Sequence, residues 1–140
     1  RDCTGNAMIG SGYTDSGHSV GAAAAVACLT ETFRLKVPEN AAARGTQLFE
    51  GLKKLKLKHG VVGDIRGGHG LMCALELVSD QASKKPVEKE TAAKMDEATY
   101  NSGTMIRISG PNIILSPPLV SQATDIDQVL TSLDKGLAAA

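Results

Sequence analysis

Glycine and proline interrupt this chain at short intervals, and their positions constrain its fold more than any other feature. Proline cannot continue a helix or a central strand, and glycine favours the backbone conformations of turns and helix ends. The segments between these residues therefore form separate short elements. The interrupting residues are Pro38, Gly60, Gly67, Gly68, Gly70, Gly103, Gly110, Pro111, Pro117 and Pro118.

The first helical segment, residues 17–36, follows a loop that is rich in glycine and hydroxyl side chains. Its first half is apolar all round and contains mainly alanine. Small apolar residues on every side predict close packing against neighbours on more than one face. Ser16 or Ser19 is the candidate N-cap of this helix.

Three further segments have the hydrophobic spacing of amphipathic helices. They are residues 38–58, a segment that ends near Asn101, and a segment that starts near Thr124, where Asp127 completes a capping pattern. The predicted buried stripes are Leu48, Leu52 and Leu55 in the first, Val87, Thr91, Met95 and Ala98 in the second, and Ile126, Val129, Leu130, Leu133 and Leu137 in the third.

Two pairs of strands lie between these helices. Residues 61–66 and 71–78 flank a glycine-rich turn, and residues 105–109 and 113–116 flank a second turn, so each pair predicts an antiparallel hairpin. Residues 79–86 are polar and predict a loop. Two helices, a hairpin, a helix, a hairpin and a helix fit an α+β fold, in which helices cover a small antiparallel sheet.

The charge, the lengths of the hydrophobic segments and the number of cysteines limit the classes of protein to which this chain can belong. Fifteen basic and fifteen acidic residues give a formal charge of zero, so nothing in the charge predicts binding to nucleic acid or to an anionic membrane. The hydrophobic segments are shorter than the roughly 20 residues of a membrane span. Three scattered cysteines indicate a reducing cytoplasm. Because the chain starts at Arg1 and not at methionine, we expect it to be part of a longer protein.

Arg107 is the only charged residue between positions 105 and 120, where almost all of its neighbours are apolar. A guanidinium keeps its charge inside a protein, so burial at this position requires an anionic partner. Strand alternation places Arg107 opposite Ile106 and Ile108, on the face that the helices leave uncovered. From the spacing alone, Arg107 is either an ordinary exposed strand residue or a fork that binds a carboxylate in a cleft.

The loop at residues 10–19 leads into the first helix and contains three glycines and several hydroxyl side chains, among them Thr14. Backbone amides and hydroxyls at a helix N-terminus suit a phosphate group. The spacing matches neither nucleotide-binding glycine motif, so a capped connecting loop is the alternative that the pattern leaves open. The three histidines show no metal-ligand spacing, and Asp64, Arg66 and Glu76 on adjacent strands predict structural ion pairs.

Three stretches together resemble the C-terminal part of the class III aminotransferases, which depend on pyridoxal phosphate. They are the run Gly-Tyr-Thr-Asp-Ser-Gly-His-Ser at residues 12–19, the strand pair at 62–77 with Asp-Ile-Arg-Gly and Gly-Leu-Met, and the block at 105–127 with Met-Ile-Arg and Leu-Ser-Pro-Pro-Leu-Val. The resemblance covers about residues 10–138, in order and at the family's spacing. It is strongest to the ω-amino acid:pyruvate group.

The resemblance implies a role for three residues. Arg107 matches the arginine that binds the substrate carboxylate and swings aside for substrates that lack one. Thr14, together with the backbone of Tyr13, matches the contact with the cofactor phosphate, which in this family crosses the interface of a homodimer or tetramer. It also implies that residues 1–16 are a remnant of the large cofactor-binding domain, 17–36 a connecting helix, and 37–140 the C-terminal small domain of a fold type I enzyme.

The family's Schiff-base lysine belongs to the large domain, upstream of this segment. We therefore expect a fragment of a cytoplasmic transaminase that moves an amino group from an amine or ω-amino acid to pyruvate or a similar keto acid. Without that lysine, the segment alone is expected to be inactive. The alternative is a free-standing, non-catalytic α+β binding or interaction module derived from the same fold.

Overall fold

The computed structural model describes residues 12–140 and has the α+β architecture that the sequence predicts. Residues 1–11 of the predicted N-terminal loop lie outside the described residues. The elements in chain order are α1 (Ser19–Arg34), α2 (Val37–Lys58), β1 (Val62–Arg66), β2 (Cys73–Asp80), β3 (Lys85–Pro86), α3 (Lys89–Asn101), β4 (Arg107–Ser109), β5 (Asn112–Leu115) and α4 (Ala123–Leu137).

The chain divides between Arg34 and Leu35 into two units. The first contains the predicted phosphate loop and α1, and α1 buries none of its residues within this chain. The close packing predicted for its faces therefore stays a prediction, as does the division into a large-domain remnant, a connecting helix and a small domain. The second unit contains the sheet and the other three helices.

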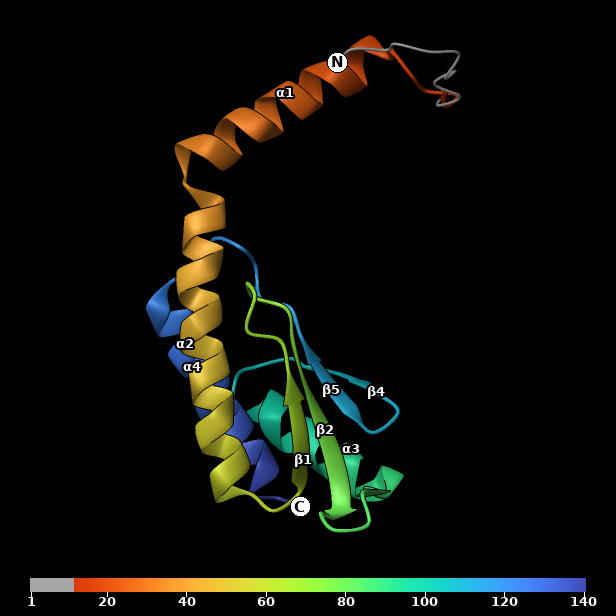
Figure 1. Ribbon diagram of the computed structural model, residues 1–140, viewed down its shortest axis with the longest axis vertical. Helices are drawn as coiled ribbons and strands as arrows, with labels where there is room; N and C mark the ends of the chain where they lie inside the picture. Colours follow the sequence, from red (N-terminus) through yellow and green to blue (C-terminus); the bar gives the residue numbers. More distant parts are fainter. Residues whose placement is uncertain (1–11) are drawn as a thin grey trace, which may run out of the picture. The chain divides into compact units, whose positions relative to one another are not determined.

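The sheet of the second unit has the strand order β1-β2-β5-β4, and every neighbouring pair is antiparallel. The two predicted hairpins therefore lie side by side, joined by the pairing of β2 with β5 (Figure 1). The register of β1 on β2 shifts between Val62 and Asp64, which marks a bulge. The predicted loop at 79–86 is partly wrong, because β2 extends to Asp80 and the short strand β3 pairs with it.

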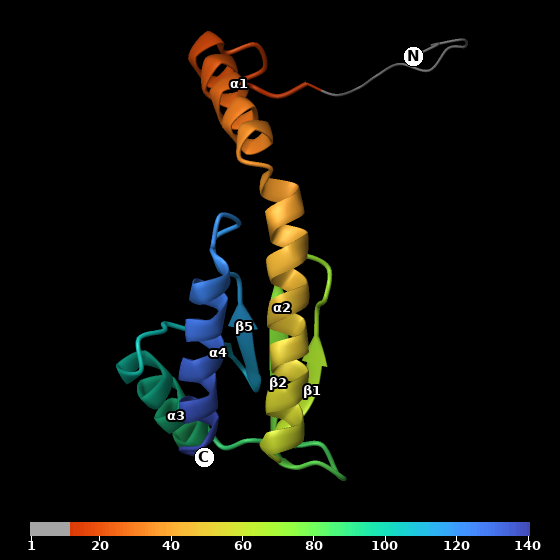
Figure 2. The ribbon, with the colours of Figure 1, turned by 90° about the vertical axis from the view of Figure 1, so that its left-hand side faces the viewer.

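Helices cover one face of this sheet. Helix α2 packs against β1 and α4, and α3 packs against α4; Figure 2 shows α3 and α4 on one side of the strands. The predicted stripes of α2 and α4 are confirmed, because their leucine and isoleucine side chains enter the core. The largest fully buried hydrophobic residues are Leu48, Leu52, Val62, Leu75, Leu77, Val78, Met95, Ile113, Ile126 and Leu133.

The buried face of α3 differs by one position from the predicted one. Met95 is buried as expected, but Ala92 and Thr99 take the places assigned to Thr91 and Ala98. The close approach of α4 to α3 determines which residues of α3 are buried. A Cβ atom on Gly136 of α4 would lie 1.9 Å from Thr99 Oγ1, so the two helices touch where a side chain is missing.

The predicted helix caps are wrong in both cases. His18 caps α1, since its Nδ1 accepts a hydrogen bond from the Gly21 N–H at 3.0 Å, whereas the hydroxyl of Ser16 belongs to the preceding turn. Helix α4 starts one residue earlier than expected, and the carboxylate of Asp125 accepts a hydrogen bond from the Gln122 N–H at 2.7 Å. Several polar side chains lie near each helix start, and the local hydrogen bonds show which of them acts as the cap.

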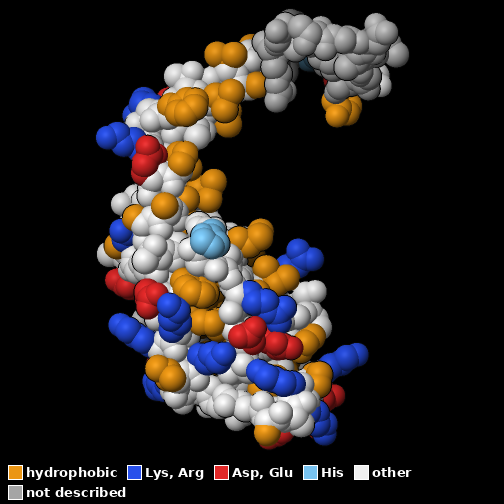
Figure 3. Space-filling model, in the orientation of Figure 1, with side chains coloured by type: hydrophobic (Ala, Val, Ile, Leu, Met, Phe, Trp, Pro, Cys, Tyr) orange, Lys and Arg blue, Asp and Glu red, His pale blue; other side chains and the backbone are white. Residues whose placement is uncertain are grey.

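The other face of the sheet carries charged side chains, and Figure 3 shows basic and acidic groups interspersed over it. Arg66 contacts Glu76 at 2.9 Å and Asp64 at 3.6 Å, which confirms the predicted structural ion pairs. Desolvation raises the pKa of the Asp64 carboxyl, but the Ile65 N–H and the Lys56 ammonium lower this pKa more, to a net value below the usual one. Within residues 12–140, no helix is long and apolar enough to cross a bilayer.

Candidate functional site

Arg107 is the first residue of β4 and lies on the uncovered face of the sheet. Ile106 and Ile108 pack against the hydrophobic core, while Arg107 and Ser109 are exposed, as strand alternation predicts. The apolar sequence around Arg107 therefore does not bury its charge within this chain. The isoleucines account for the hydrophobic pattern, and the guanidinium needs no internal carboxylate.

Two arginines lie at opposite ends of one row across this face. Arg66 pairs with Ala74, Ala74 with Ile114, and Ile114 with Arg107. Because directly paired residues of neighbouring strands share a face, Arg66 and Arg107 point to the same side of the sheet.

Only one of these two arginines has a protein partner among residues 12–140. Arg66 is held by Glu76, whereas Arg107 forms no ion pair with the described residues. The planar fork of Arg107 is thus available to an external anion, and its geometry favours a carboxylate bound through two parallel hydrogen bonds.

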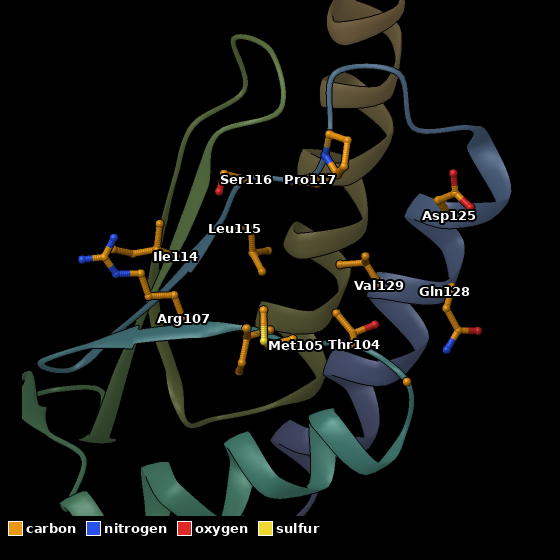
Figure 4. Close-up of a pocket in the computed structure, with 13 residues that line it drawn as sticks. Thr104, Met105, Arg107, Ile114, Leu115, Ser116, Pro117, Asp125, Gln128 and Val129 are labelled. Atoms are coloured by element: carbon orange, nitrogen blue, oxygen red, sulfur yellow. The ribbon is translucent and has the colours of Figure 1, made fainter.

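A pocket of about 520 Å³ lies between the β4–β5 hairpin and α4, with Arg107 among its lining residues. In Figure 4, the Arg107 side chain is on one side, while Asp125 and Gln128 of α4 are on the other. The volume falls in the usual range for small-molecule sites. The other lining residues are Gly103, Thr104, Met105, Ile106, Ile114, Leu115, Ser116, Pro117, Pro118 and Val129.

Thr14 lies in an exposed turn that precedes α1 in the first unit. Within this turn, the Tyr13 N–H donates to Ser16 Oγ at 3.0 Å, and the Ser16 N–H donates to the Tyr13 carbonyl at 2.9 Å. The Tyr13 amide therefore already has a partner in this conformation. Thr14 is exposed in the turn that leads into α1, and the partial positive charge at the N-terminus of a helix suits a phosphate.

The candidate residues belong to different units, with Tyr13 and Thr14 in the first and Arg107 in the second. Sequence reasoning missed one residue beside the Arg107 pocket. Asn40, in the first turn of α2, donates from Nδ2 to the Leu119 carbonyl at 2.8 Å and to the Ser121 carbonyl at 3.0 Å. An asparagine at a helix start suggests a local cap, and no sequence signal connects it to a loop some 80 positions away.

The sequence from residue 3 to residue 137 matches the family described as Aminotransferase class-III. The chain belongs to this family. Membership confirms the resemblance derived from the three sequence stretches, and the small antiparallel sheet covered by helices is consistent with the small domain of these enzymes.

Individual relatives agree with this assignment. The taurine–pyruvate aminotransferase of Bilophila wadsworthia is 35% identical over 129 residues, which cover 87% of this chain and 28% of the relative. A mitochondrial alanine–glyoxylate aminotransferase 2 homolog of Arabidopsis thaliana is 38% identical over 128 residues, which cover 89% of this chain and 26% of that relative. The chain thus spans less than a third of the length of these relatives.

Solved structures show the same fold. The PLP-bound amine transaminase from an uncultivated Pseudomonas species superposes with a TM-score of 0.83 at 38% identity, over 94% of this chain and 30% of that one. The (S)-enantioselective omega-transaminase of Thermomicrobium roseum gives a TM-score of 0.79 at 32% identity. The match covers 96% of this chain and 30% of the transaminase. The second unit of this chain therefore has the architecture of a transaminase domain.

Proposed function

We propose that this chain is the C-terminal part of a pyridoxal-phosphate-dependent transaminase, in which Arg107 binds the carboxylate of the keto acid or amino acid substrate. The observation that carries the proposal is that Arg107 lines a pocket, is exposed and forms no ion pair with residues 12–140, in a chain of the class III family. The relatives named for taurine, pyruvate, alanine and glyoxylate support an amine or ω-amino acid as donor and a small keto acid as acceptor.

Pyridoxal 5′-phosphate is the cofactor of the family and supplies the electron sink for the transfer when it is bound. Thr14 fits its phosphate, because it is an exposed hydroxyl residue in the turn that leads into a helix. Tyr13 fits less well through its amide, which donates to Ser16. The cofactor-anchoring lysine is proposed to lie outside this segment, in the cofactor-binding domain of the complete enzyme.

Arg107 has two tasks in this proposal. It fixes the carboxylate of a keto acid through two charge-assisted hydrogen bonds and so orients the adjacent carbon for the transfer. It also leaves room for an amine that has no carboxylate. Because the side chain has no ion pair with the rest of the described chain, moving it aside breaks none.

The whole enzyme is proposed to be a cytoplasmic homodimer or tetramer with shared active sites. The proposal is tested on the complete gene product, whose intact mass and amino-terminal sequence show whether a cofactor-binding domain precedes Arg1. The purified product loaded with pyridoxal phosphate is expected to form alanine from pyruvate and an amine donor. A natural product that begins at Arg1 and has no companion chain with lysine-bound cofactor would favour the non-catalytic module.

Replacing Thr14 by valine in the complete enzyme is expected to weaken cofactor binding by about 10- to 100-fold. Valine has nearly the same shape but no hydroxyl, and a hydrogen bond to a charged group contributes about 1.5–3 kcal/mol. Titration of the apoenzyme with pyridoxal phosphate, followed by cofactor absorbance, measures the change. Thr14→Ser keeps the hydroxyl and is expected to retain most of the affinity. Equal affinities for all three proteins would remove Thr14 from the phosphate site.

A further inference from the structure

The loop from Ser116 to Ser121 contributes its first three residues to one wall of the Arg107 pocket, and two of these residues are prolines. Ser116, Pro117 and Pro118 line the pocket directly. The two prolines have no N–H group, so neither can donate a hydrogen bond to a neighbouring segment. The carbonyl groups must therefore contribute much of the hydrogen bonding that holds this loop in place.

Asn40 supplies donors to two of these carbonyl groups. Its side-chain amide, on the first turn of α2, bonds Leu119 at 2.8 Å and Ser121 at 3.0 Å. Both partners are carbonyl oxygens, which determines that the Nδ2 group faces them. Asn40 is half-buried and Ser121 is buried, so the bond to the Ser121 carbonyl is partly shielded from water, whereas the bond to the Leu119 carbonyl is exposed.

A single side chain thus connects α2 to the loop that follows β5. The Ser121 N–H also donates to the Pro118 carbonyl at 3.0 Å, so the end of the loop is a closed turn held on Asn40. Because Ser116 directly follows β5, and β5 pairs with β4 at Arg107, the turn and the arginine are the two ends of one continuous pocket wall. Figure 4 shows Ser116 and Pro117 leading from the strand beside Arg107 towards α4.

We propose that Asn40 is a positioning residue, which holds the Ser116–Ser121 loop so that the Arg107 pocket keeps the shape that a small keto acid requires. The effect on the substrate rests on the proposed function, whereas the contact between Asn40 and the loop does not. Its effect is expected on substrates that are held against this wall by Arg107, and not on amines that lack a carboxylate.

Two variants of the complete enzyme test the role. Asn40→Ser is too short to reach the loop. Asn40→Asp has the shape of asparagine but turns a carboxylate oxygen towards two carbonyl oxygens, so any effect it has does not come from lost volume. Gln47→Ser is the matched control, since Gln47 lies two turns further along α2 and bonds the Ala123 carbonyl and the Asp127 carboxylate of α4 instead of the loop.

Hydrogen exchange of peptides that span residues 117–122 shows whether Asn40 holds the loop in place, and this measurement does not require enzyme activity. In both Asn40 variants, the Ser121 amide is expected to exchange at least about tenfold faster than in the wild type, while the amides of α3 are unchanged. Exchange rates equal to those of the wild type would show that Asn40 does not hold the loop in place.

Steady-state kinetics measure the consequence for substrate. Both Asn40 variants are expected to raise KM for pyruvate by about 5- to 20-fold with little change in kcat, and to leave the half-reaction with a carboxylate-free amine within about twofold. Gln47→Ser is expected to leave both unchanged. A faster-exchanging loop with an unaltered pyruvate KM would overturn the positioning role. An inactive wild type would overturn both the proposed function and the effect of Asn40 on pyruvate binding. Hydrogen exchange would still show whether Asn40 holds the loop in place.

Discussion

Replacing Arg107 by alanine in the complete enzyme is expected to lower kcat/KM for pyruvate by about 100- to 1000-fold. Two charge-assisted hydrogen bonds to a carboxylate are lost, which corresponds to about 3–4 kcal/mol of transition-state stabilisation. The half-reaction with an amine that has no carboxylate is expected to change by less than about threefold, because Arg107 makes no contact with such a donor in the proposed site. Rapid mixing with each substrate in turn, followed by cofactor absorbance, separates the two half-reactions.

Two matched variants identify the cause of that loss. Arg107→Lys keeps the positive charge but loses the planar fork, so its loss is expected to lie between those of wild type and alanine. Arg66→Ala removes the other arginine of the same row, which is already paired with Glu76, and is expected to leave pyruvate kinetics unchanged. An equal loss with both substrates, accompanied by a lower melting temperature, would make Arg107 a structural residue.

The sequence predicts most of the elements because short-range chemistry determines them. Pro38 lies in the first turn of α2, Gly103 has the positive φ of 99° expected after α3, and the turn at Gly110 joins β4 to β5. Each of these needs only the residue and its neighbours. The hydrophobic stripe of α2 is equally local, since Leu48, Leu52 and Leu55 recur at helical spacing.

The features that the sequence does not predict depend on contacts between distant segments. The one-position rotation of α3 follows from Gly136 of α4, and the tether of Asn40 follows from the path of the loop after β5. Strand alternation placed Arg107 on the correct face of the sheet, but it left open whether that face is open to solvent or forms a cleft. Whether a polar strand face meets solvent or another domain is a property of the assembled protein.

The contact between α3 and α4 offers the largest expected effect on stability. Replacing Gly136 by alanine in the 140-residue chain is expected to lower the free energy of unfolding by about 2–3 kcal/mol. The new Cβ atom would lie 1.9 Å from Thr99 Oγ1 and 2.9 Å from the Met95 carbonyl oxygen, so the helices must move apart. The higher helix propensity of alanine, about 1 kcal/mol, offsets only part of this cost. Urea unfolding followed by circular dichroism measures the difference.

A double-mutant cycle separates overpacking from other effects of the substitution. Thr99→Ala removes the hydroxyl that the new Cβ meets, together with its 2.7 Å bond to the Met95 carbonyl. Gly136→Ala combined with Thr99→Ala is therefore expected to be more stable than the sum of the single changes implies, by at least about 1 kcal/mol. Gly60→Ala, where a Cβ meets nothing within 4 Å, serves as the control and is expected to change stability by less than about 0.5 kcal/mol. Additive effects in the cycle would contradict a direct clash, and the loss at Gly136 would then have to arise elsewhere in α4.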